Sequence, residues 1–347
     1  MKKGKFFLML MVIGLIISPA LVFAGGETDS AAGSSDLPKK IGYVTNYATH
    51  EWYQNVIKGM QDRCDELGIE LEVLDANLDM AKEVAMVEDL MARGVDALIV
   101  TPVDAAGTVA LVKKAKMEGI PMVLEGNRVD GMEVLVAICD YDAGYKGGLE
   151  TGKIAAKMGI SPKVLAVDLP ALNACVLRVD GFMDGIKVNA PDAVLVHRVD
   201  GKGSKDEALQ VSTDALTQDS DINVIYGCND NSSLGAYQAF KAAGLNEDEL
   251  IICGTGLEGL AAVYALQEIP AYMVEAAMLP EKNGLTCVDA AVSLYRGEEL
   301  PEHIVSATIA LTKDTWENLY GIDADGKRYP KWDAINALET EAQCTKY

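Results

Sequence analysis

Basic residues are scarce in this sequence. The chain of 347 residues has 30 lysines and arginines against 52 aspartates and glutamates, so its formal net charge at pH 7 is −22. A surface that binds nucleic acid or anionic lipid needs clusters of lysine and arginine to offset phosphate charge. The composition therefore excludes nucleic acid as an expected partner, and it favours a neutral or cationic small molecule.

The sequence also lacks the short motifs of common enzymes and metal sites. It contains no CxxC pair, no Walker sequence and no Gly-x-Ser-x-Gly elbow. The three histidines, His50, His197 and His303, are not spaced as metal ligands. We therefore expect no metal, no cofactor and no catalytic activity.

One motif favours an enzyme. Residues 254–259 match GxGxxG, and Glu275 follows after about 20 residues, as in a dinucleotide-binding fingerprint. The motif nevertheless lies late in its half of the chain, where a fingerprint would come first, and no catalytic constellation accompanies it. An exported NAD-dependent oxidoreductase is thus the least favoured alternative.

Long apolar runs are absent except at the start. Residues 1–24 contain three lysines, an apolar stretch over 6–17 and the ending Val22-Phe23-Ala24, which is typical of a cleaved signal peptide. The apolar stretch spans about 12 residues, whereas a membrane-spanning helix needs about 20. No cysteine lies near the cleavage point, so we expect a periplasmic or secreted protein without a lipid anchor. Residues 25–38 are rich in Gly, Ser and Ala and predict a flexible leader.

From residue 39 onward, short apolar strands alternate with amphipathic helices. This rhythm is typical of a doubly wound parallel sheet, and it starts again after about residue 140. A chain of this length also exceeds the usual size of one domain. The predicted strands are 40–45, 69–75, 96–100 and 120–124 in the first half, then 163–167, 193–198, 222–227, 249–253 and 271–275, with a strand-like stretch at 304–311. The sequence thus predicts an α/β protein with two doubly wound lobes.

Seven cysteines are scattered along the chain, and their number is odd. Most are interpreted as small buried apolar residues. Cys228 and Cys253 are a candidate disulfide, because both follow or end predicted strands of one lobe.

Several segments together resemble one family. They are IGYVTNYATHEWYQNVIKGMQD, MVEDLMARGVDALIVTPVDAAG, KKAKMEGIPMV, NR at 127–128, DYDAGYKGG, RVDGF at 178–182 and YGCNDNSSLGA, in that order. From Ile41 to about Leu319 the chain resembles a type I periplasmic binding protein of the ribose/galactose kind, the substrate-capturing subunit of a sugar ABC transporter.

The resemblance implies two lobes that are joined by a three-segment hinge and close around one ligand. The expected lobes are 39–139 plus 279–309 and 140–278 plus 310–325, followed by a C-terminal tail at 326–347. It also implies delivery of the ligand to an ABC permease. A periplasmic sensory receptor for a sugar or an autoinducer-2-like molecule, acting through a membrane sensor, is the alternative.

Candidate ligand-binding residues lie where predicted strands end, because open α/β sheets bind ligands there. Polar groups for sugar hydroxyls and rings for sugar faces are found at Asn46, Trp52, Tyr53, Glu125 and Asn127. The pair Trp52-Tyr53 matches the family's aromatic pair; alternatively, it anchors the first helix by hydrophobic contact.

Other candidates depend on the family pattern. Arg128 and Arg178 match its two ligand arginines, although each is also interpretable as a surface ion pair. Asn229 is preferred over Asp230 as a contact, since the aspartate suits a helix cap. Asp140 lies at the first expected hinge.

The pattern is broken at one place. Gly254-Thr255-Gly256 replaces the family's Gly-Phe-Asp, so a carboxylate from another wall is expected to substitute: Glu125, Glu258 or Glu275. The sequence consequently indicates the family more firmly than the ligand: a sugar, a modified sugar or a polyol.

Overall fold

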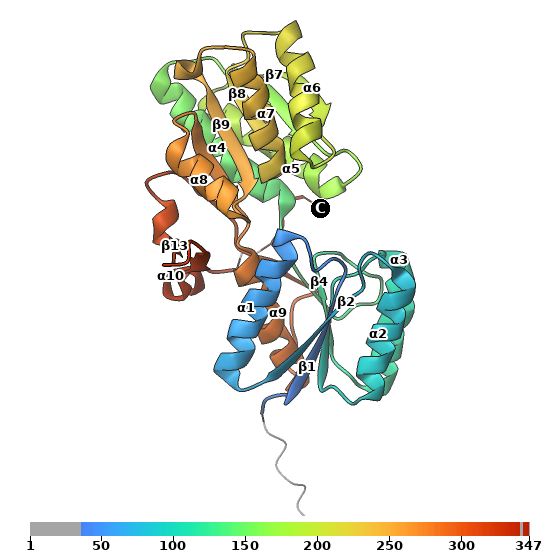
Figure 1. The fold of residues 1–347 in the computed structure, drawn as a ribbon. Coiled ribbons are helices and arrows are strands. Elements are labelled where there is room, and N and C mark those ends of the chain that lie inside the picture. Colours follow the sequence, from blue (N-terminus) through green and yellow to red (C-terminus); the bar gives the residue numbers. More distant parts are fainter. Residues whose placement is uncertain (1–35, 341–342, 347) are drawn as a thin grey trace, which may run out of the picture. The chain divides into compact units, whose positions relative to one another are not determined.

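Two six-stranded sheets organise the chain, each in its own lobe (Figure 1). The computed structural model describes residues 36–340 and 343–346. The predicted signal peptide and nearly all of the leader up to residue 35 lie outside these ranges. Within them, every helix is too short or too polar to span a bilayer.

The first lobe has a wholly parallel sheet in the order β11-β5-β4-β3-β1-β2. Its strands are β1 (Lys40–Thr45), β2 (Glu70–Asp75), β3 (Ala97–Val100), β4 (Met122–Glu125), β5 (Val134–Ile138) and β11 (His303–Ser306). Figure 1 shows the helices on its two faces: α1 (Glu51–Leu67) and α9 (Pro280–Tyr295) on one, α2 (Met80–Ala92) and α3 (Ala105–Glu118) on the other. Since both faces are covered, β3 and β4 are buried at every residue.

The second lobe repeats this plan in the order β12-β10-β9-β8-β6-β7. Its strands are β6 (Lys163–Asp168), β7 (Val194–Asp200), β8 (Val224–Gly227), β9 (Ile251–Gly256), β10 (Tyr272–Ala277) and β12 (Ile309–Leu311). Its helices are α4 (Asp140–Met158), α5 (Asn173–Asn189), α6 (Lys205–Gln218), α7 (Asp230–Ala242) and α8 (Leu260–Glu268), with a short 3₁₀ turn at Glu247–Glu249. The edge strand β12 runs antiparallel to β10, so this sheet is mixed rather than parallel throughout.

Local sequence signals set the helix ends. The side chains of Asp79, Asp104 and Ser204 accept hydrogen bonds from the first-turn N–H groups of α2, α3 and α6. At the other end, Gly68 and Gly119 close α1 and α3 with a φ of 71° and 72°, a conformation that glycine adopts without strain.

Close helix pairs hold each lobe together. A Cβ on Gly144 of α4 would lie 1.9 Å from the carbonyl oxygen of Arg178 on α5, and one on Gly59 of α1 would lie 2.0 Å from that of Glu281 on α9. Only glycine permits backbones to approach so closely. These contacts fix α4 against α5 and α1 against α9.

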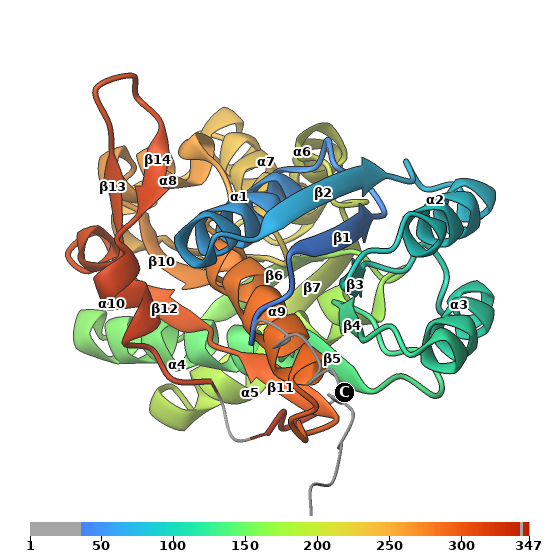
Figure 2. The same ribbon diagram turned by 90° about the horizontal axis from the view of Figure 1, so that it is seen from below.

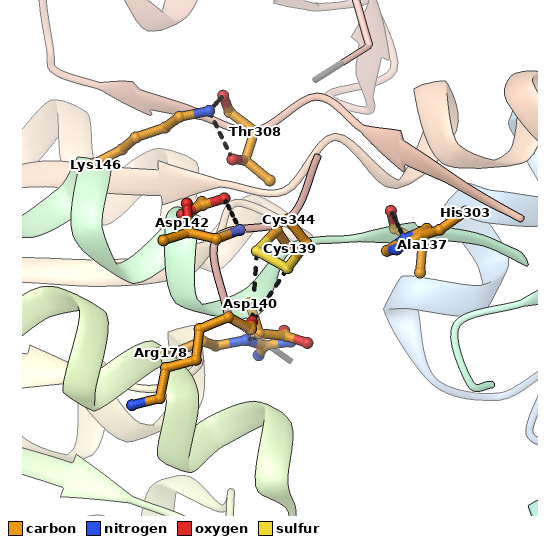
Figure 3. The surroundings of a disulfide bond; sticks show 11 residues. Ala137, Cys139, Asp140, Asp142, Lys146, Arg178, His303, Thr308 and Cys344 are labelled. Atoms are coloured by element: carbon orange, nitrogen blue, oxygen red, sulfur yellow. Dashed lines mark hydrogen bonds and ion pairs between the residues drawn. A yellow bond between two sulfur atoms is a disulfide. The ribbon is translucent and has the colours of Figure 1, made fainter. Parts of the chain in front are cut away.

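The chain crosses between the lobes at three places. Cys139 separates β5 from α4, Met278 and Leu279 separate β10 from α9, and residues 307–308 separate β11 from β12. Lys146 on α4 donates to the carbonyl oxygen of Thr308 at 2.7 Å, which fastens the third crossing to the first (Figure 3).

Two strand predictions need correction. Strand β5 was not predicted, although Val134–Ile138 is an apolar run between β4 and the first crossing. The stretch at 304–311 was read as one strand, but it is divided between β11 and β12 in different sheets. Both errors arise where the chain leaves the simple strand–helix alternation.

The segment after β12 is ordered. It forms a 3₁₀ turn at Trp316–Asn318, the antiparallel hairpin β13 (Tyr320–Ile322) and β14 (Arg328–Pro330), and the short helix α10 (Trp332–Asn336). Figure 2 shows the hairpin extending from the side of the molecule where α8 and α10 lie. Trp332 donates to Asp62 of α1 at 3.0 Å, so this segment contacts the first lobe as well as the core of the second.

The predicted disulfide is wrong. Cys228 and Cys253 are both free and buried. Because Tyr226 of β8 pairs with Cys253 of β9, Cys228 is offset by two residues along neighbouring strands, which places the two Cα atoms roughly 8 Å apart, beyond disulfide reach. The disulfide instead joins Cys139, at the first crossing, to Cys344 near the end of the chain (Figure 3).

This disulfide should contribute strongly to stability. It links residues 205 positions apart, so it removes much of the conformational entropy of the unfolded chain. We expect the double substitution Cys139→Ser/Cys344→Ser to lower the free energy of unfolding by about 2–5 kcal/mol in denaturant titrations. Reductant should destabilise the wild type equally and leave the double variant unchanged. Equal stability of the two proteins under oxidising conditions would contradict the expectation.

Candidate functional site

A cavity of about 320 Å³ lies between the lobes. Its walls come from loops that follow strands and from the first turns of α1, α7 and α8. The lining residues are Tyr47, Thr49, His50, Glu51, Asn229, Asp230, Asn231, Leu234, Glu258, Gly259, Ala261 and Ala262. The volume is that of a small-molecule site, and the position at strand ends is the expected one for open α/β sheets.

The wall from the first lobe is the loop between β1 and α1. His50 caps α1, since its Nδ1 accepts from the Trp52 N–H at 3.1 Å, and burial lowers the pKa of His50. The imidazole is therefore neutral near pH 7. Its ring makes an edge contact with Tyr53, the two centroids being 6.1 Å apart.

Behind this loop, Glu125 is fully buried at the end of β4. It accepts hydrogen bonds from the Thr101 hydroxyl at 2.7 Å and the Asn283 amide at 2.7 Å, and Trp52 adds a third. Burial nevertheless raises the pKa of Glu125 to about 7. Glu125 and Trp52 thus support the loop from behind and do not line the cavity.

Asn46 directly follows β1 and is only 8% exposed. Its Nδ2 donates to the carbonyl oxygen of Pro102 at 3.3 Å. Its Oδ1 is buried and has no hydrogen-bond partner in the described part of the chain. Asn46 is not among the residues that line the cavity.

The wall from the second lobe is built on buried carboxyl groups. Asp230 accepts from the N–H groups of Leu257 and Glu258 at 3.3 and 3.0 Å, and Glu275 accepts from the Leu257 N–H and from the Tyr272 hydroxyl. Burial raises the pKa of Asp230, and burial together with the repulsion of Asp230 raises the pKa of Glu275. Glu275 lies beneath the turn, whereas Asp230 reaches the cavity.

Arg178 and Asp140 form an ion pair at the start of α4. The Arg178 Nε donates to Asp140 at 2.8 Å, and its Nη1 donates to the carbonyl oxygen of Cys228 at 3.1 Å. Figure 3 shows this pair next to the disulfide at the first crossing. The side chain of Arg178 is 14% exposed, so it is no surface ion pair.

The helix cap that was expected of Asp230 is provided by Asn229. Asn229 caps α7, because its Oδ1 accepts from the Ser232 N–H at 2.8 Å while its Nδ2 donates to the Gly203 carbonyl at 3.1 Å. Asp230 holds the turn before α8 and does not cap. Asn229 lines the cavity with both amide ends already bonded.

The structure does not bring Asn127 and Arg128 to the cavity. Both are exposed, and Arg128 forms an ion pair with Glu302 at 2.5 Å. Of the predicted contacts, Asn229 lines the cavity, Tyr53 lies against the lining residue His50, and Arg128 lies apart. The ligand contacts of these residues stay predictions.

In the GxGxxG turn, backbone N–H groups are bonded to the protein's own side chains. The N–H groups of Leu257 and Glu258 are bonded to carboxylates, and a Cβ on Gly254 would lie 1.9 Å from the Tyr272 hydroxyl. A pyrophosphate needs such N–H groups free and would meet negative charge here. The glycines make room for side chains rather than for a dinucleotide.

The lining residues Tyr47, Glu51 and Glu258 are absent from the predicted ligand contacts. Each follows a strand by a few residues, which is a usable signal. The sequence gives no sign of which residues of the two lobes contact each other. One such contact is the Asn55 side-chain amide, which donates to the Glu258 carbonyl oxygen at 2.8 Å.

Comparison with known proteins agrees with this architecture. The family model described as "Periplasmic binding protein domain" matches residues 41–299. The ribose import binding protein RbsB of Haemophilus influenzae is 29% identical over 286 residues, which cover 82% of this chain and 94% of that protein. The xylitol-binding protein of Mycolicibacterium smegmatis is 26% identical and covers 87% of this chain and 86% of its own length.

A solved structure shares the fold. The periplasmic solute-binding protein of an ABC transporter from Actinobacillus succinogenes, with bound D-allose, superposes with a TM-score of 0.71 at 24% identity, over 80% of this chain and 99% of that one. The chain belongs to the periplasmic binding protein family, and the two-lobed type I fold is confirmed.

Glu125 gives a testable pH dependence. Its pKa is raised from 4.5 to about 7 in the folded state, so the folded protein keeps a proton that the unfolded chain releases. Stability from this group is thus full below pH 4.5 and is lost as pH rises to about 7, at up to about 1.4 kcal/mol per pH unit. In Glu125→Gln this loss should vanish, whereas in Glu88→Gln, an exposed control, it should persist. Parallel unfolding curves for Glu125→Gln and the wild type between pH 5 and 7 would contradict the assignment.

Proposed function

We propose that the protein is the substrate-binding component of an ABC import system and captures a sugar, a polyol or a related small molecule. The observation that carries this proposal is the cavity between the lobes, whose polar walls come from both of them. Membership of the periplasmic binding protein family and the named ligands of the relatives support it.

The proposed mechanism is capture without chemistry. Groups of the first lobe (Asn46, Tyr53) and of the second (Arg178, Asn229) contact one ligand only when the lobes are close together. Binding energy then favours a compact, ligand-bound form of the protein. A membrane permease distinguishes this form from the open, ligand-free form. The crossings at Cys139, at 278–279 and at 307–308 are the proposed hinge. Export by the signal peptide at 1–24, without a lipid anchor, would place the protein in the periplasm.

Binding without turnover is the direct test. The protein lacking residues 1–24 should show a raised melting temperature with at least one monosaccharide or polyol, because a ligand that binds only the folded state stabilises it by about 4 kcal/mol at 1,000 times its Kd. The bound compound should be recovered unchanged by chromatography, and the saturated protein should have a smaller radius of gyration in X-ray scattering. Catalytic conversion of the compound, or stabilisation by NAD alone, would refute the proposal.

The arginines provide a second test. A hydroxyl that loses a charged donor costs about 1.5–3 kcal/mol, so Arg178→Ala should weaken binding of the identified ligand about tenfold or more in calorimetric titration. The matched control is Arg198→Ala, which removes an arginine paired with Asp168 outside the cavity. Arg128→Ala should weaken binding similarly if lobe closure brings it to the ligand. Wild-type affinity in Arg178→Ala would remove that residue from the site.

A further inference from the structure

The chain after β12 reaches all three crossings between the lobes. It starts at the third crossing, which β12 directly follows. Arg328 on β14 forms an ion pair at 2.6 Å with Glu281, which comes shortly after the second crossing. Cys344 is joined by the disulfide to Cys139 at the first crossing. The described residues from 312 onward, here called the C-terminal strap, are thus attached along the whole hinge.

The C-terminal strap is anchored in the second lobe. Its side chains Trp316, Leu319, Tyr320 and Ile335 are buried in the same apolar core as side chains of β8, β9 and α8. Close packing in a shared core is lost only when that core opens. The C-terminal strap therefore moves together with the second lobe.

Polar side chains of the C-terminal strap reach the first lobe. The Trp332 Nε1 donates to Asp62 on α1 at 3.0 Å. At the start of α9, Glu281 pairs with Arg328 and accepts from the Tyr320 hydroxyl at 3.2 Å. The Arg328 and Glu281 side chains are 4% and 2% exposed, so solvent ions screen this pair little. The C-terminal strap thus bonds to both α1 and α9.

Another bond joins the lobes at the edge of the cleft. The Asn55 side-chain amide on α1 donates to the Glu258 carbonyl oxygen at 2.8 Å, and Arg328 donates to the same oxygen at 3.3 Å. The lobes touch beside it, because a Cβ on Gly259 would lie 2.5 Å from a carboxylate oxygen of Glu51. One oxygen of the second lobe is therefore bonded both by the first lobe and by the C-terminal strap.

These bonds differ in how much they depend on the angle between the lobes. Asn55 and Asp62 lie about two turns apart on α1, so a rotation that withdraws Asn55 from the second lobe also displaces Asp62 from Trp332. Glu281 lies beside the second crossing, where a rotation of the lobes moves atoms least. The attachment at Glu281 consequently persists in every arrangement, whereas the bonds of Asn55 and Trp332 require the lobes to be close together.

We propose that the bonds of Asn55 and Trp332 form a latch that stabilises the closed arrangement of the lobes without contacting the ligand. Neither residue lines the cavity that the described residues form. The latch raises affinity for any ligand that needs both walls, because the apparent Kd equals the intrinsic Kd divided by the fraction of protein in the competent form. The inference goes beyond the proposed function, since the latch acts on the protein before any ligand binds.

X-ray scattering of the ligand-free protein lacking residues 1–24 tests the latch. Trp332→Phe keeps an apolar ring and removes the N–H donor, and Asn55→Ala removes the amide. A hydrogen bond changes an equilibrium by about two- to tenfold, so each substitution should raise the ratio of open to closed protein by about that factor. The double variant should therefore have a larger radius of gyration than the wild type.

Bonds of the same kinds within one lobe supply a matched control. Tyr237 donates to Glu247 at 2.9 Å and the Asn189 amide donates to the Leu149 carbonyl oxygen at 3.2 Å, both inside the second lobe. The double variant Tyr237→Phe/Asn189→Ala should keep the wild-type scattering curve. Far-UV circular dichroism checks the folding of both double variants, and each single latch variant carries the test if the double one does not fold.

Equal radii of gyration for the latch variants and the wild type would overturn the inference, and so would an equal increase in the control. A sugar or polyol that binds the wild type should dissociate faster from the double latch variant and bind it several-fold more weakly. Unchanged affinity for that compound would also overturn the inference. Because the scattering measurement requires no ligand, failure of the latch leaves the proposed function standing, and failure of the proposed function leaves the latch standing.

Discussion

The three crossings between the lobes are the constraint on which the rest of the structure depends. Each lobe has its own sheet and its own helices on both faces, so each has a separate core. Because α9 returns to the first lobe and β12 to the second, neither lobe is one continuous stretch of chain. The carboxyl ends of both sheets consequently face a shared cleft, and loops far apart in the sequence line one cavity.

The same constraint explains the position of the disulfide. Cys139 occupies the first crossing, and the segment that ends at Cys344 packs on the second lobe and contacts α1 through Trp332. The N–H of Thr345 also donates to Asp142 on α4 at 3.1 Å. The end of the chain is thereby attached at the hinge itself. Its buried ion pair between Arg328 and Glu281 adds a second attachment near the second crossing.

The second-lobe wall of the cleft is organised by carboxyl groups rather than by a ligand. Asp230 and Glu275 hold the backbone of the turn at 257–258, which sets the position of Glu258. Burying two carboxyl groups side by side is unfavourable unless a proton or N–H groups neutralise them. Here the N–H groups of Leu257 and Glu258 do so, and they fix the glycine-rich turn to the carboxyl groups beneath it.

The sequence by itself determined the alternation of strands and helices, the two lobes and the family, because these follow from apolar periodicity, capping residues and motifs that are local in the chain. It also placed Asn46, Tyr53, Arg178 and Asn229 at strand ends or on the helices beside them. Only the tertiary structure decided that β12 runs antiparallel in the second sheet, that Cys139 pairs with Cys344, and that Glu51 and Glu258 face one another while Arg128 pairs with Glu302. These features join residues tens to hundreds of positions apart, and their partners are chosen by how the two lobes pack, which no local pattern encodes.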